Sequence, residues 1–357
     1  MQIDKIRDQR NSSIELLRII SIVGVVILHY NNINWGRGFN YVNENSINSN
    51  AMHLLECISI VSVNVFILIS GYFLIKSEKR SLVKPIRLIV QVIFFVTTFY
   101  VITIIKDKSV FSISGLIRII PSTLWYLSVY IALYLVSPFI NKLLNSISNE
   151  NRKLLLLLMF ILFSVEPTLV DLLNSVSGES YNYLSFISLM GSDAGYSIVN
   201  FILVYIIGAL IRQNEESLIQ IRVIRLILYY LLSLLMNFLF YLLIGDCALN
   251  YSNPLVVIQS ALVFMIALRI RMKNNRIINL LSKAAFTAYI IHVFFFDYFD
   301  IQAYVNRPLL IYLSHTFATA LIIYAVSWIL YMIYSCIEAP VLKVLNKISD
   351  SCNYRID

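Results

Sequence analysis

Arg18 and His29 lie in the first long apolar stretch of the chain, where ionisable side chains are costly. On a helix, a separation of eleven residues brings them within roughly 20° of one face and about 16 Å apart along the axis. Glu15 precedes Arg18 by three positions, which permits an ion pair. A neutral imidazole can remove a proton from a hydroxyl group, and a guanidinium can hold a developing or resident negative charge. The alternative is that Arg18 turns toward the membrane surface and His29 is an interfacial residue.

Four further ionisable residues fall in apolar stretches: Glu56, Glu166, His292 and His315. His292 has no charged neighbour in its own stretch, so it needs a partner on another helix, in either a structural or a functional role. Glu56 stands near the end of its stretch where it could orient His29. Ser70, which a glycine follows, is either a weak nucleophile candidate or a small residue at a helix crossing.

Basic residues gather in two short polar segments, at positions 76–87 and 269–283. Such clusters can bind an anionic substrate, and they can equally face lipid phosphates. We take four of these residues as weak candidates for donor binding: Lys76, Arg80, Arg269 and Arg271.

The elements that position these residues are predicted to be transmembrane helices. Hydrophobic residues make up 59% of the 357 residues, charged residues only 13%, and the mean hydropathy is +0.77. A helix needs about 20 apolar residues to cross a bilayer, and ten segments meet this criterion. The predicted segments are 14–30, 54–75, 86–105, 124–144, 154–173, 196–211, 224–244, 254–270, 284–299 and 309–336.

The basic residues predict how these helices are oriented. Lys and Arg number 22 on one set of alternating ends and 5 on the other. Because basic residues favour the cytoplasmic side, both chain ends are expected there. The net charge of +8 then reflects membrane orientation rather than nucleic-acid binding. We expect a single all-α integral membrane domain over residues 1–357, without an appended soluble domain.

Other classes of site find little support. The four cysteines, Cys57, Cys247, Cys336 and Cys352, are far apart and form no C-x-x-C pair, so neither a disulfide framework nor a zinc site is expected. The first apolar stretch carries charges and lacks a cleavage site, which argues against a signal peptide.

Several separate motifs resemble those of the acyltransferase 3 family of bacterial membrane acyltransferases. Arg18 and His29 match its Arg-x10-His signature, and residues 64–74 are similar to its V-D-L-F-F-x-x-S-G-F-L stretch, with Asn64 where many members have Asp. The sequence W-Y-L beginning at Trp125 and the Y-L-V-S-P after it resemble a further motif. Y-I-I-H ending at His292 and E-A-P at positions 338–340 resemble two more. The likeness spans nearly the whole chain in the expected order.

The resemblance implies transfer of an acyl group, most often acetyl, from cytoplasmic acetyl-CoA to a sugar hydroxyl. The acceptor would be a cell-surface polysaccharide or its lipid-linked precursor, and the protein would lie in the bacterial plasma membrane in contact with lipid. His29 would be the general base or a transient acyl carrier, and Arg18 would position the donor or stabilise negative charge. Glu15, Glu56, Asn64, Ser70, Trp125 and His292 would support them, and no metal is expected.

Two other functions remain open. A transporter or flippase for a glycan or acyl group would also carry intramembrane charges, although no inverted repeat is visible. A polysaccharide polymerase or export partner usually has a larger external loop rich in Arg. The acyl group, the acceptor and the oligomeric state do not follow from the sequence.

Overall fold

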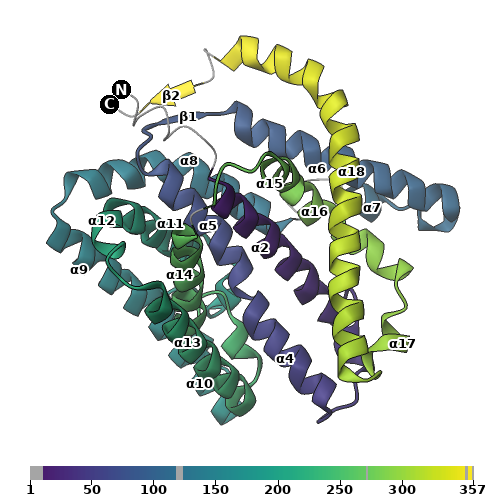
Figure 1. Cartoon of the computed structure of the whole chain (residues 1–357), viewed down its shortest axis with the longest axis horizontal. Helices are drawn as coiled ribbons and strands as arrows, with labels where there is room; N and C mark the ends of the chain where they lie inside the picture. Colours follow the sequence, from purple (N-terminus) through teal and green to yellow (C-terminus); the bar gives the residue numbers. More distant parts are fainter. Residues whose placement is uncertain (1–10, 118–123, 271, 350–352, 356–357) are drawn as a thin grey trace.

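The computed structural model describes residues 11–117, 124–270, 272–349 and 353–355, which are almost entirely helical (Figure 1). The longer helices are α2 Ser12–Asn31, α4 Ile47–Ser59, α5 Val61–Leu74, α6 Val83–Lys106, α8 Trp125–Ser146, α9 Asn149–Phe160, α10 Glu166–Ser177, α11 Ile198–Gln213, α13 Val223–Ile244, α14 Pro254–Arg269, α16 Ala285–Ile291 and α18 Leu309–Ser349. The shorter ones are α3 Gly38–Tyr41, α7 Ile113–Ile117, α12 Glu215–Leu218, α15 Arg276–Leu281 and α17 Ile301–Val305. Strands β1 Lys79–Ser81 and β2 Asn353–Arg355 pair antiparallel.

Within the described residues, nine helical stretches are long and apolar enough to cross a bilayer. A tenth apolar helix, α11, is shorter, at 16 residues. Each of these ten overlaps one of the ten segments predicted from hydropathy. The fold class is therefore confirmed, and the chain is an all-α, multi-pass membrane protein.

The second segment differs from its predicted bounds of 54–75. It begins at Ile47, and a break at Ile60 divides it into α4 and α5. Residues 47–53 are polar enough to resemble a loop, but Ser46 caps them, its side chain accepting a hydrogen bond from the Ser49 amide at 3.0 Å. Met52 and Leu55 are then buried against other helices. Tertiary packing thus extends a helix through a sequence of low hydropathy.

Two further spans are irregular. A π-helical segment, Ile161–Val165, joins α9 to α10 just before Pro167, whose missing amide hydrogen interrupts the regular ladder. In the ninth span, α16 gives way at His292 to a 3₁₀ segment, His292–Tyr298. The predicted helix over 284–299 is therefore regular only in its first half.

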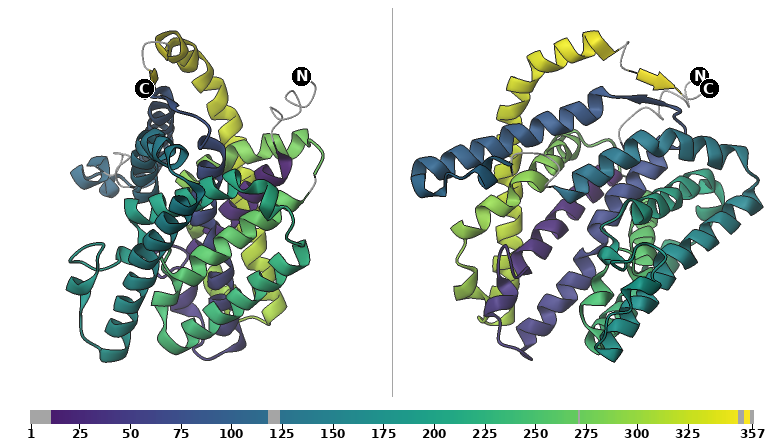
Figure 2. Two further views of the ribbon diagram at one scale, coloured as in Figure 1. Left: turned by 90° about the vertical axis from the view of Figure 1, so that its left-hand side faces the viewer. Right: turned by 180° about the vertical axis from the view of Figure 1, so that it is seen from behind.

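The helices form an inner group and an outer group. In the most apolar part of the span formed by α4 and α5, 72% of the residues are buried, and in α2 61% are, against 11% in α13 and 17% in α6. Figures 1 and 2 show α2, α4 and α5 running between α18 on one side and α9, α10 and α13 on the other. The exposed apolar side chains of the outer helices are those expected to face lipid.

The contact between α5 and α11 depends on a glycine. A methyl group added at Gly71 would lie 2.1 Å from the Tyr205 carbonyl oxygen, which belongs to the backbone and cannot turn away. We therefore expect Gly71→Ala to destabilise the fold by about 1–3 kcal/mol, the usual cost of overpacking. Thermal unfolding in detergent measures this.

The matched control is Gly24→Ala, where the added methyl would meet the Ser62 hydroxyl, a side-chain atom that can rotate. Equal melting temperatures for Gly71→Ala and the wild-type protein would contradict this account of the helix contact.

Candidate functional site

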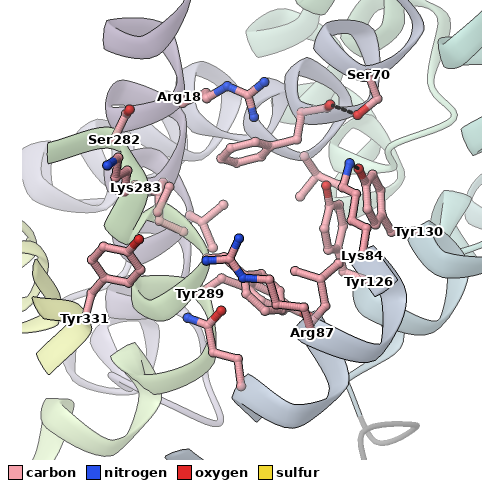
Figure 3. A pocket seen from close by; sticks show the side chains of 18 of the residues that line it. Arg18, Ser70, Lys84, Arg87, Tyr126, Tyr130, Ser282, Lys283, Tyr289 and Tyr331 are labelled. Atoms are coloured by element: carbon pink, nitrogen blue, oxygen red, sulfur yellow. Dashed lines mark hydrogen bonds between the residues drawn. The ribbon is translucent and has the colours of Figure 1, made fainter. Parts of the chain in front are cut away.

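A cavity of about 620 Å³ lies beside the inner helices α2 and α5 (Figure 3). Side chains from α2, α5, α6, α8 and α18 line it, together with residues 282–289 around the start of α16. Arg18 and His29 both line this cavity, and so do Glu15, Ser70 and Trp125. Because α2 rises 1.5 Å per residue, Arg18 and His29 lie about 16 Å apart along the wall of the cavity.

One end of the cavity is basic. Among the described residues that line it, four are cationic and one is a carboxylate, Glu15. The cations are Arg18, Lys84, Arg87 and Lys283. Lys84 and Arg87 stand in the first turns of α6, and Lys283 just precedes α16, so all belong to helix ends predicted to be cytoplasmic. Figure 3 shows Arg18, Lys84, Arg87 and Lys283 around a central space.

Two of the four cations are held by protein partners. Arg87 donates two hydrogen bonds of 2.6 Å to the buried carboxylate of Glu338, from Nε and from an Nη atom. Lys84 Nζ donates to the Tyr130 hydroxyl at 2.9 Å and lies 4.7 Å from the centre of the Tyr134 ring. These contacts hold both side chains in place at the basic end. Glu338 neutralises the charge of Arg87, whereas Lys84 has uncharged partners and keeps its charge.

Arg18 is only partly satisfied. Its Nε lies 3.8 Å from Glu15 Oε2, and that oxygen accepts a shorter hydrogen bond of 2.6 Å from the Ser282 hydroxyl. The Nε atom is buried and has no hydrogen-bond partner among the described residues. A buried donor without a partner is rare in native structures, so this guanidinium is available to a ligand in the cavity.

The other end of the cavity contains His29, whose tautomer is fixed by its backbone. Nδ1 lies 2.9 Å from the Val25 carbonyl oxygen. A carbonyl can only accept, so Nδ1 carries the hydrogen and Nε2 is left with a free lone pair. The imidazole is therefore arranged to accept a proton at Nε2.

His292 has the same arrangement and lies beside His29. Its Nδ1 is 2.9 Å from the Ala288 carbonyl oxygen, and its Nε2 is buried without a hydrogen-bond partner in the described part of the chain. The two ring centres are 4.7 Å apart, edge to face. His292 is buried and does not itself line the cavity, so it forms a layer behind His29, contributed by a residue 263 positions away in the sequence.

A series of aromatic rings connects the two ends. Tyr130 stacks on Tyr126 with ring centres 5.9 Å apart, Tyr126 contacts Tyr289 at 5.4 Å, and Tyr289 contacts His292 at 6.4 Å. The three tyrosines line the cavity, and Figure 3 shows Tyr126 and Tyr130 side by side. This wall is apolar along its ring faces and polar at its hydroxyl groups.

Trp125 lies at the start of α8 and lines the cavity. Its ring packs against Tyr196 and Tyr251, with centres 4.3 and 5.7 Å away. Ser70 also lines the cavity, but its hydroxyl bonds to the Phe66 carbonyl at 3.0 Å within its own helix. The Ser70 hydroxyl is therefore bonded to the backbone, and within the described residues no basic side chain is placed to activate it as a nucleophile.

Asn64 and Glu56 take positions outside the cavity lining. Asn64 Nδ2 donates to the Tyr251 carbonyl at 2.9 Å, a bond that an ionised Asp could not make. At this position the chain thus uses a hydrogen-bonding amide rather than a charge. Glu56 Oε1 accepts a 2.9 Å hydrogen bond from Asn31 Nδ2. Glu56 is thus bonded to Asn31 rather than to His29, whose Nδ1 is held by the Val25 carbonyl.

Of the four loop cations expected to bind the donor, the three that the structure describes do not line the cavity. Arg80 is buried and donates to the Ser137 hydroxyl at 2.9 Å and to backbone carbonyls. Arg269 donates to the Leu218 and Ile221 carbonyls at 2.9 and 2.5 Å and so holds the turn between α12 and α13. Lys76 is exposed, and Arg271 lies outside the described residues. Besides Arg18, which the sequence predicts, the cations that line the cavity are Lys84, Arg87 and Lys283; they belong to the same two clusters but are not among the predicted residues.

The aromatic wall was also not predicted. Its signal in the sequence is the spacing of Tyr126, Tyr130 and Tyr134, four residues apart, which places three rings on one face of a helix.

Comparison with known families identifies the chain. The family model Acyl_transf_3, described as an acyltransferase domain, matches residues 11–332 and confirms the resemblance. No curated protein and no solved structure matches the chain. The match includes every residue that lines the cavity, whereas Glu338, the partner of Arg87, lies beyond it. The chain therefore belongs to the acyltransferase 3 family and is a membrane acyltransferase.

Proposed function

We propose that this protein is an O-acetyltransferase of the bacterial plasma membrane. It moves an acetyl group from cytoplasmic acetyl-CoA to a sugar hydroxyl of a cell-surface polysaccharide or its lipid-linked precursor. The observation that carries the proposal is that one cavity has four cations at one end and a histidine with a free Nε2 at the other. The reaction requires a site that binds the phosphates of CoA and a base that accepts the proton of the sugar hydroxyl.

The donor is assigned to the basic end. CoA carries its phosphates at one end and its thioester at the other, with a long uncharged arm between them. Lys84, Arg87 and Lys283 are placed to receive the phosphates, since charge-assisted hydrogen bonds to phosphate are strong. The arm then follows the tyrosine wall, and the thioester reaches His29.

Arg18 is assigned to the donor as well. It lies about 16 Å from His29 along α2, a distance that an arginine side chain is too short to cover. Arg18 therefore cannot stabilise negative charge at a carbonyl that reacts beside His29. Of the two roles expected for it, positioning the donor agrees with the geometry.

The reaction at His29 needs one proton acceptor. The acceptor hydroxyl oxygen forms a bond to the acetyl carbonyl carbon while its proton passes to His29 Nε2. The C–S bond of the thioester then breaks, its electron pair leaves on sulfur, and His29 returns the proton to the thiolate. Acetyl-CoA and the acceptor hydroxyl give the ester and the CoA thiol, and His29 returns to its neutral form, so atoms and protons balance.

His292 acts through His29. Once His29 Nε2 holds a proton it becomes a donor, and the unpartnered Nε2 of His292 beside it can accept. Because a hydrogen bond to a charged group is worth about 1.5–3 kcal/mol, we expect His292→Leu to lower kcat about tenfold. KM for acetyl-CoA should stay unchanged, and His292→Gln, which keeps an acceptor, should recover part of the rate.

Steady-state kinetics on purified variants with matched melting temperatures measures this effect. If His292→Gln and His292→Leu lose the same activity, His292 has only a packing role.

The proposed function is tested with membranes that contain the wild-type protein and native glycan. Labelled acetyl-CoA is supplied on the cytoplasmic face, and label is sought in the glycan. Label in ester linkage to sugar supports the proposal. Movement of glycan or acetyl across the membrane without ester formation would favour the transporter alternative.

A further inference from the structure

Trp35 is the second aromatic ring that contacts His29. The two ring centres are 6.5 Å apart, at an angle of 53°. The other ring at His29, that of His292, is 2% exposed, whereas Trp35 is 47% exposed. His29 therefore has a buried neighbour on one side and an accessible indole on another.

The chain holds Trp35 in place through a tight turn. The Gly36 amide donates to the His29 carbonyl at 2.9 Å, and the Arg37 amide donates to the Asn32 carbonyl at 2.7 Å. A methyl group added at Gly36 would lie 2.2 Å from the Tyr30 carbonyl oxygen, so the turn can close this tightly only with glycine. Trp35 is thus fixed to the same helix end that presents His29.

The turn that carries Trp35 also carries two polar residues, Asn34 and Arg37. Both are exposed, and within the described residues their side chains have no hydrogen-bond or ion-pair partner. The turn follows the end of α2 that the charge distribution predicts to be outside. An aromatic face beside free amide and guanidinium donors suits a ligand with one apolar face and several hydroxyl groups.

We propose that Trp35 is the platform on which the acceptor sugar stacks, as a pyranose that presents a hydroxyl to His29. This proposal rests on the proposed function and adds the place of the acceptor. The C–H face of a pyranose packs on the indole, while Asn34 and Arg37 bond its outer hydroxyls. The donor fills the cavity from the basic end, so the acceptor approaches His29 from the Trp35 side.

The alternative for an exposed tryptophan is an interfacial anchor in the membrane. Ile33 provides a matched control, because it belongs to the same turn and is 55% exposed but has no ring to stack on a sugar. An anchoring role would make Trp35→Ala and Ile33→Ala similar, and a sugar platform would separate them.

The experiment uses the full chain in lipid nanodiscs and a panel of methyl glycosides of glucose, galactose and N-acetylglucosamine. Saturation-transfer NMR detects binding, and labelled acetyl-CoA detects acetyl transfer to the same glycosides. We expect the wild-type protein and Ile33→Ala to bind at least one glycoside. Trp35→Ala should weaken binding and raise KM for the glycoside about tenfold, the effect of losing one ring contact. Trp35→Phe should bind the glycoside nearly as well as the wild-type protein and keep a similar KM for it. KM for acetyl-CoA should not change in either variant.

The two proposals fail in different ways. Sugar binding that depends on Trp35 without any acetyl transfer would overturn the acetyltransferase and leave the platform. Acetyl transfer with unchanged glycoside KM in Trp35→Ala would overturn the platform and leave the acetyltransferase. Absence of binding to every glycoside in the wild-type protein would also overturn the platform.

Discussion

Replacing His29 by alanine is expected to lower kcat for acetyl transfer about 10³-fold, within the range that a general base contributes. The reason is that Nδ1 is bonded to the Val25 carbonyl, which leaves Nε2 as the nitrogen that can accept a proton in the proposed reaction. The Val25 carbonyl also accepts a backbone hydrogen bond within α2. Removing the imidazole therefore leaves this carbonyl satisfied and should change the stability of the fold little. Transfer of labelled acetyl from acetyl-CoA, measured with equal amounts of folded protein, gives the rate.

His53→Ala is the matched control. His53 stacks between Phe39 and Tyr241, with ring centres 4.8 and 4.5 Å away, and does not line the cavity. Its replacement should leave the rate within about twofold, as is usual for a change outside the site. If His29→Ala kept wild-type activity, the proposed mechanism would be wrong.

Replacing Arg18 by glutamine should act on the donor instead. We expect KM for acetyl-CoA to rise about 10–100-fold, the equivalent of losing a charge-assisted hydrogen bond, while kcat at saturating donor falls much less. Arg18→Lys should recover part of the affinity, because the charge remains but the buried Nε donor is lost. Initial rates over a range of acetyl-CoA concentrations separate the two parameters.

Lys153→Gln is the control for charge alone. Lys153 is exposed in α9, on a helix end also predicted to be cytoplasmic, and does not line the cavity. Its removal should leave KM for acetyl-CoA nearly unchanged. A fall in kcat with unchanged KM in Arg18→Gln would place Arg18 at the reacting carbonyl and contradict the donor role.

The sequence by itself determined the helices and the face that joins Arg18 to His29. Hydropathy over 20 residues and a period of 3.6 residues are local properties, and neither depends on which helices become neighbours. For that reason each of the ten predicted segments overlaps an apolar helical stretch. The family was also accessible, because its motifs are short and lie in order along the chain.

The tertiary structure alone decided which polar side chains share the cavity. Positive residues at helix ends satisfy membrane orientation whichever way they point, so charge could not separate Lys84 and Lys283 from Arg80 and Arg269. The pairing of His29 with His292 joins helices far apart in the chain. The extension of the second span to Ile47 depends on burial by neighbouring helices. These features arise from contacts between distant residues, and no local pattern encodes them.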